Sequence, residues 1–323
     1  MTRAGGAQPI MKPAFSGKTP GNSLCARGNL CLLLACLAWG TTFVVQKTAM
    51  AHLGPFTYSG MRFLLGALFL LPLVVHRLRK RQGLEPSAPP GKISLLLGAS
   101  ALTGLLVFAG INLQQIGLIS STAGKGGFIT GLYVIIVPAL GLLAGQRAGA
   151  GEWLGALLAL GGLYLLSVTS GFTLAPGDGW LLAGAIVWAC QVFSLGWLSP
   201  KLDSLILAFG QALVCALLSL AVAVALEEPR MEDMRAAAFD LVYGGIVSVG
   251  LGFTLQVAGQ KYASAGHAAI IMQFEAVIAV LAGWYFLGEV MTIRGLAGCG
   301  LMLAGMLVSG LAQAEGRSRS SGI

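Results

Sequence analysis

Short polar loops divide the chain into ten apolar runs, and this feature most limits what the chain can fold into. A helix needs roughly 20 mostly apolar residues to cross the hydrocarbon core of a bilayer. The predicted spans are 30–47, 56–75, 93–113, 122–143, 150–168, 179–198, 205–225, 236–257, 263–287 and 292–311. Only 10% of the residues are charged, against about 25% in soluble domains, so a soluble or disordered protein is excluded. The sequence predicts an all-α polytopic membrane protein with ten transmembrane helices.

The composition also excludes other classes of protein and site. The net charge is +8, but the basic residues lie in loops and tails rather than on one face, which excludes a nucleic-acid partner. The six cysteines form no CxxC pair and the three histidines no HExxH motif, so we predict no metal site. Gly17-Lys18-Thr19 ends like a P-loop, yet position 12 is lysine instead of the first glycine. We therefore predict no cofactor and no nucleotide site.

The distribution of lysine and arginine predicts the orientation, because these residues stay in cytoplasmic loops. With the N-terminus inside, fourteen lysines and arginines lie in the inner segments and five at the outer ends. An even number of spans returns the C-terminus to the same side. We predict a multi-pass protein of the cell (inner or plasma) membrane with cytoplasmic tails at 1–29, which is disordered, and at 313–323.

An internal repeat divides the chain into two five-helix units, 30–170 and 171–312. Because five is odd, the second unit is predicted to lie inverted relative to the first, and inverted repeats place a binding site near the midplane between them. Three alignments carry the repeat: Ser121–Lys125 with Ala263–His267, Gly155 and Gly162 with Gly298 and Gly305, and Leu33–Trp39 with Leu182–Trp188.

Several motifs resemble the EamA-type family of the drug/metabolite transporter superfamily. They are Trp39-Gly-Thr-Thr-Phe43 with Lys47, the pair Arg62-Phe63, Thr122-Ala-Gly with Pro138, and Ser264-Ala-Gly through Glu275 to Leu287-Gly-Glu289. The first repeat departs from the family pattern, with Gly145-Gln146-Arg147 where Gly-Glu is usual. The resemblance implies an exporter or exchanger of small organic metabolites, with a central cavity lined by both halves.

Glu275 is the main candidate for a functional residue, because it is the acid predicted at the middle of a span. A charge at this depth costs about 2.5–3.5 kcal/mol on insertion scales and usually belongs to a transport pathway or a partner. Its repeat equivalent is Tyr133. The candidate ligands of Glu275 are a proton or an amine. The alternative is that Glu275 forms a structural hydrogen bond between helices.

Three further groups are candidates for gating or coupling. Lys125 and His267 occupy equivalent positions at the starts of the fourth and ninth spans, one near each face. Arg62 lies deeper, within the second span. The alternative is that Lys125 and His267 extend their polar ends to the membrane–water interface. Arg62 would then bind backbone carbonyls of a neighbouring helix.

Neutral polar and aromatic residues inside the spans are candidates for the substrate pathway. An amide in lipid is costly without a partner, so some amides must face a wet cavity. Trp39 and Trp188 are equivalent in the repeat and could offer a π face to a cation. The selected residues are Trp39, Trp188, Gln191, Asn112, Gln256 and Gln273, together with Glu275 and Tyr133.

The sequence thus predicts a secondary active transporter, an exporter or exchanger of metabolites such as amino acids, that works by alternating access. A nucleotide-sugar-type carrier or an importer of the same superfamily is the alternative within transporters. A membrane-embedded enzyme would show clustered carboxylates or a Ser/His constellation at one face, so we predict no enzyme. The sequence leaves proton coupling and a homodimer open.

Overall fold

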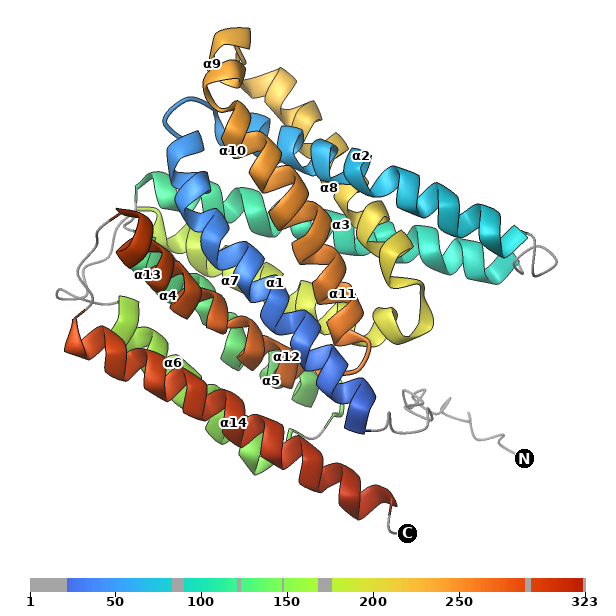
Figure 1. Cartoon of the computed structure of the whole chain (residues 1–323), viewed down its shortest axis with the longest axis vertical. Helices are drawn as coiled ribbons and strands as arrows, with labels where there is room; N and C mark the ends of the chain where they lie inside the picture. Colours follow the sequence, from blue (N-terminus) through green and yellow to red (C-terminus); the bar gives the residue numbers. More distant parts are fainter. Residues whose placement is uncertain are drawn as a thin grey trace, which may run out of the picture.

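The structure is a computed structural model that describes residues 22–82, 90–120, 123–146, 148–167, 176–287 and 292–321 (Figure 1). All regular elements in these residues are helices, so the prediction of an all-α protein is confirmed. Most of the predicted tail at 1–29 lies outside the described residues. Its last part, residues 22–29, is helical, because no proline interrupts this stretch and the first helix continues beyond the apolar run.

The first half of the chain contains six of the described helices. They are α1 (Asn22–Ala49), α2 (Pro55–Gln82), α3 (Pro90–Ile119), α4 (Ala123–Gly131), α5 (Tyr133–Leu143) and α6 (Ala150–Ser167). The second half contains further long helices and additional short elements. They are α7 (Asp178–Leu198), η1 (Ser199–Lys201), α8 (Ser204–Leu226), α9 (Met231–Ala236), α10 (Ala238–Tyr243), the π-helix η2 (Gly244–Phe253), α11 (Thr254–Gln260), α12 (Ala265–Met272), α13 (Phe274–Leu287) and α14 (Ile293–Ser321).

Eight helical stretches of the described chain are long and apolar enough to cross a membrane. Two shorter apolar stretches, Gly127–Leu143 and Ala150–Leu166, coincide with the fourth and fifth predicted spans. The chain is therefore a multi-pass membrane protein, and eight of the ten predicted spans have full crossing length in the part that the structure describes.

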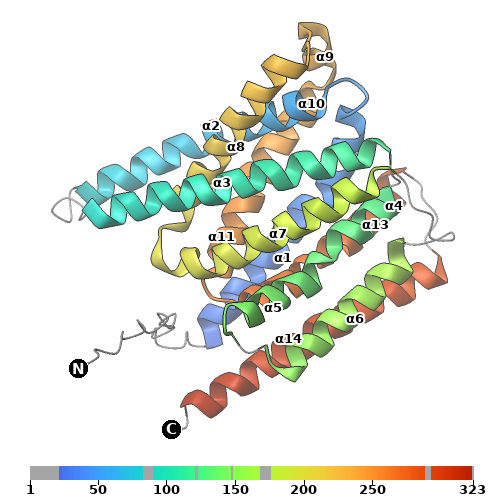
Figure 2. The same cartoon turned by 180° about the vertical axis from the view of Figure 1, so that it is seen from behind.

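The helices pack in one bundle in which α2 and α3 are inclined to α1, and the start of α1 and the end of α14 lie at the same end (Figures 1 and 2). Helices α6 and α14 form one flank, and α2, α3 and α8 form the opposite flank. Between them, α1 packs against α11, α12, α13 and η2, all of which belong to the second half. The two halves are therefore interleaved, and the centre of the bundle is built by both.

Helices α6 and α14 run antiparallel and meet backbone to backbone through glycines. A Cβ atom added at Gly155 would lie 2.7 Å from the carbonyl oxygen of Gly305, and one at Gly162 would lie 2.5 Å from that of Gly298. In the reverse direction, a Cβ at Gly305 would lie 2.5 Å from the carbonyl oxygen of Gly155, and one at Gly298 would lie 2.6 Å from that of Gly162. Small residues let membrane helices approach this closely, so these glycines allow α6 and α14 to pack against each other at short distance.

Acidic side chains connect α2 and α8 at both of their ends. The Glu227 carboxylate accepts hydrogen bonds from the backbone amides of Phe56 at 3.0 Å and Thr57 at 2.8 Å, in the first turn of α2. At the other end, Asp203 caps α8 and forms an ion pair with Arg77 of α2 at 3.1 Å. Carboxylates are stabilising at helix N-termini, so these contacts stabilise the packing of α2 on α8.

Two spans contain a single irregular residue inside the bundle. Leu132 lies between α4 and α5, and Gln273 lies between α12 and α13. Both keep helical backbone angles, with φ and ψ of −57° and −17° at Leu132 and of −60° and −18° at Gln273, so each span runs on as one helix. The two irregular positions touch, because the Gln273 side-chain amide donates to the backbone carbonyl of Gly131 at 2.9 Å.

Candidate functional site

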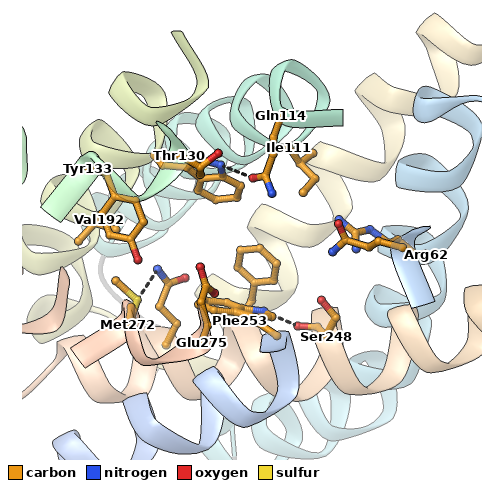
Figure 3. Close-up of a pocket in the computed structure, with 14 residues that line it drawn as sticks. Arg62, Ile111, Gln114, Thr130, Tyr133, Val192, Ser248, Phe253, Met272 and Glu275 are labelled. Carbon is orange, nitrogen blue, oxygen red and sulfur yellow. Dashed lines mark hydrogen bonds between the residues drawn. The ribbon is translucent and has the colours of Figure 1, made fainter. Parts of the chain in front are cut away.

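A cavity of about 590 Å³, which includes space open to solvent, lies among helices of both halves (Figure 3). Helices α1 to α5, α7, η2 and α11 to α13 contribute to its walls. The lining residues are Trp39, Gln46, Arg62, Ile111, Gln114, Thr130, Tyr133, Trp188, Val192, Ser248, Phe253, Gln256, Met272 and Glu275.

Glu275 faces this cavity from the first turn of α13. It lies two residues after the irregular position at Gln273, within the span that α12 and α13 form. Among the described residues, the Glu275 carboxylate has no hydrogen-bond or ion-pair partner. It is therefore available to a ligand.

Tyr133 faces the same cavity as the first residue of α5. The side chain is 6% exposed, and Figure 3 shows its hydroxyl pointing into the space that the Glu275 carboxylate also enters. The two residues that the predicted repeat aligns therefore line one cavity, each close to the irregular residue of its span. The pair provides a hydroxyl donor and a carboxylate acceptor from opposite halves of the chain.

Three aromatic rings form a wall of the cavity. Phe253, at the end of the π-helix η2, lies with its ring centroid 5.1 Å from that of Trp39 and 6.4 Å from that of Trp188. The Trp39 indole N–H donates to the carbonyl of Ser248 at 3.1 Å, and the Trp188 indole N–H donates to Oε1 of Gln114 at 3.0 Å. Because both indole donors are paired, the wall offers its apolar faces to a ligand.

Amide side chains support this wall from behind and beside it. Gln191 is fully buried and exchanges hydrogen bonds of 3.4 Å and 3.2 Å with Gln256. The Gln256 amide also lies 3.6 Å from the sulfur of Met272. Only Gln256 of this pair lines the cavity, so Gln191 has the role of holding Gln256 in position.

Arg62 lines the cavity from α2 and is 1% exposed. Its guanidinium carbon lies 5.0 Å from the centroid of the Tyr58 ring and 5.3 Å from that of Phe63. The site thus contains one basic and one acidic side chain, Arg62 and Glu275.

Other predicted site residues lie outside the cavity lining. Asn112 connects α3 to α8 through Ser219 at 3.2 Å, and Gln273 connects α12 and α13 to Gly131 of α4. His267 is buried, with its Nδ1 atom 2.8 Å from the hydroxyl of Ser309 on α14. Lys125 belongs to α4, but its side chain lies outside the described residues. The contacts of Asn112, Gln273 and His267 join neighbouring helices, because a span packed on several sides also places polar side chains between neighbours.

Sequence reasoning missed several lining residues. Gln46 and Gln114 carry a recognisable signal, an amide inside an apolar run, but the run does not show which face meets the cavity. Phe253 and Met272 carry no such signal, because an apolar residue in a membrane span looks the same whether it faces lipid, helix or ligand. In the described part of the chain, no group of three or more His, Cys, Asp or Glu side chains could hold a metal ion.

Comparisons with known proteins agree with this architecture. The EamA-like transporter family model matches the chain twice, over residues 26–168 and 175–311. An uncharacterized transporter of Archaeoglobus fulgidus is 28% identical over 284 residues, which cover 88% of this chain and 85% of that protein. The uncharacterized transporter YoaV of Bacillus subtilis is 24% identical over 282 residues, covering 84% and 93%.

Two further similarities come from a plant protein and a solved structure. A chloroplastic WAT1-related protein of Arabidopsis thaliana is 25% identical over 282 residues, 82% of this chain and 65% of that protein. A crystal structure with 20% identity matches with a TM-score of 0.72 over 88% of this chain and 98% of the other, which shows a shared fold. The family match covers most of the chain, and we conclude that this protein belongs to the EamA-like transporter family.

Proposed function

We propose that the protein is a secondary active transporter that exports or exchanges small organic metabolites, such as amino acids and related compounds, by alternating access. The observation that carries this proposal is the central cavity, which is lined by both halves of the chain and by Glu275. Secondary transporters built from inverted repeats place their substrate sites near the midplane, at the interface between the repeats. The names of its relatives as transporters support the same class.

We also propose that the chain has ten spans in two inverted five-helix repeats, 30–170 and 171–312. The twofold family match supports the duplication. The glycine contacts support the inversion: Gly155 meets Gly305 while Gly162 meets Gly298, and the repeat pairs Gly155 with Gly298 and Gly162 with Gly305. Crossed contacts of this kind are the signature of a twofold axis between equivalent helices.

Alternating access requires that one end of the cavity closes while the other opens. At the end where α1 begins, the halves approach closely: a Cβ at Gly28 on α1 would lie 3.0 Å from the carbonyl oxygen of Gly259 on α11. The Glu152 carboxylate of the first half fills the space beside Gly266, at the start of α12. We propose that these two contacts, which join the halves, form the closed inner gate and separate when the halves rock.

Flux measurements test the transport function. Purified protein in proteoliposomes is expected to move at least one radiolabelled compound from a panel of amino acids, purines and amines, and the flux should respond to a pH gradient if protons are coupled. Protein-free liposomes are the control for leakage. No protein-dependent flux or exchange of any compound on the panel, in either direction, would contradict the proposed substrate range.

Reporter fusions test the orientation. We expect both termini in the cytoplasm, because lysine and arginine are concentrated in the segments that this orientation places inside. A fusion at residue 85 should fluoresce with green fluorescent protein, and a fusion at residue 230 should show alkaline phosphatase activity. The opposite signals would contradict the orientation, and equal signals at both positions would contradict the odd number of crossings between them.

A further inference from the structure

Arg62 is a buried cation whose donors are left without partners. Its side chain is 1% exposed, and among the described residues its Nε and Nη1 atoms have no hydrogen-bond acceptor. The nearby rings of Tyr58 and Phe63 contact the guanidinium through their π systems, but they cannot neutralise its charge. The Tyr58 hydroxyl has no hydrogen-bond partner either. This corner of the cavity therefore contains unsatisfied donors.

Leaving such a group unpaired is costly. A cation within a membrane span is normally paired with an acid or with backbone carbonyls, or it faces a water-filled path. In the described chain, the arginine that forms an ion pair is Arg77, whose partner is Asp203. This pair lies at the end of α2, away from Arg62. Glu275 lines the same cavity but forms no ion pair with Arg62. Because no acid of the described chain forms an ion pair with Arg62, a group that enters the cavity can supply the partner that the guanidinium lacks.

The position of Arg62 gives such a partner access. Figure 3 shows Arg62 at one end of the cavity and Tyr133 at the other, with Phe253 between them. A ligand that stacks on the aromatic wall would extend one end toward Arg62. Guanidinium groups bind carboxylates and phosphates in bidentate geometry, which suits a planar acceptor at this end.

We propose that Arg62 binds an anionic group, a carboxylate or a phosphate, on the transported compound. This inference rests on the proposed transport function and adds a requirement that the function alone does not make: the substrate carries a negative charge at the end that faces α2. Arg62 is then a binding residue for the substrate, instead of the gating or coupling group suggested by its position in the sequence.

A binding experiment separates this proposal from transport itself. Wild-type protein in lipid nanodiscs is titrated with 3-phenylpropionate, phenyl phosphate and the neutral 3-phenylpropionamide, and binding is followed by quenching of tryptophan fluorescence and by thermal stabilisation. Trp39 and Trp188 lie in the cavity and provide the signal. We expect one of the two anions to bind about tenfold or more tightly than the amide, as a charge-assisted hydrogen bond provides. The better anion identifies carboxylate or phosphate as the preferred group.

Variants of Arg62 assign the preference to this side chain. Arg62→Met keeps most of the volume without the charge, and it should bind the anion and the amide with equal affinity. Arg62→Lys keeps the charge but loses the bidentate fork, so it should retain part of the preference. Equal binding of anions and amide by the wild type, or the absence of binding by any probe, overturns the proposal, as does an undiminished preference in folded Arg62→Met. Flux in proteoliposomes is measured separately, so a protein that transports without any preference for anions would refute only the role of Arg62.

Discussion

Replacing Glu275 with glutamine is expected to reduce substrate flux about tenfold or more while the protein remains folded. The carboxylate lines the cavity without a partner in the described chain, so a substrate or a proton is its natural ligand. Glutamine has the same shape but cannot carry a charge or exchange a proton. Losing one charge-assisted interaction of about 1.5–3 kcal/mol corresponds to a change of this size.

The alternative to this prediction is a purely structural role for the Glu275 carboxylate. If Glu275 only holds helices together, glutamine should transport nearly as well as glutamate, because its amide still forms hydrogen bonds. Glu275→Ala should then lower the melting temperature by leaving polar groups unpaired. Flux and melting temperature measured for both variants distinguish the two roles. A glutamine variant with full flux that still responds to a pH gradient would refute the functional role.

Replacing Gly162 with leucine is expected to destabilise the flank that α6 and α14 form. A Cβ at Gly162 would lie 2.5 Å from the carbonyl oxygen of Gly298 and 2.6 Å from Cγ of Met302. The carbonyl belongs to a helix backbone and cannot move without shifting α14. Overpacking typically costs about 1–3 kcal/mol, and we expect a fall of several degrees in melting temperature in nanodiscs.

The neighbouring glycine provides a matched control. A Cβ at Gly161 meets no atom within 4 Å, so Gly161→Leu adds the same side chain to the same helix without a clash. Its melting temperature should stay near the wild-type value. On α14, Gly298→Leu should behave like Gly162→Leu, and Gly300→Leu like Gly161→Leu. Equal losses in the clashing and open positions would show that the close crossing is not what stabilises this flank.

The membrane class of the protein follows from the sequence. A bilayer requires long apolar helices, so the spans are recognisable as runs of apolar residues. The predicted internal repeat aligns Tyr133 with Glu275, and the structure places both on one cavity. Such an alignment is informative because equivalent residues of two related units occupy equivalent positions in their helices.

The faces of the helices were decided by tertiary packing alone. Gln114 lines the cavity while Gln191 and Asn112 do not, although all three are amides inside apolar runs. Gln191 pairs with Gln256 on another helix, and Asn112 with Ser219. An apolar environment surrounds every span, so the sequence has no polar face that marks the direction of the core.

The same reason applies to the glycine crossing. Gly161 and Gly162 are identical in sequence terms, and only the position of α14 places a backbone carbonyl against one and leaves open space beside the other. Such contacts join segments more than 100 residues apart, and they exist only once the two halves have packed together.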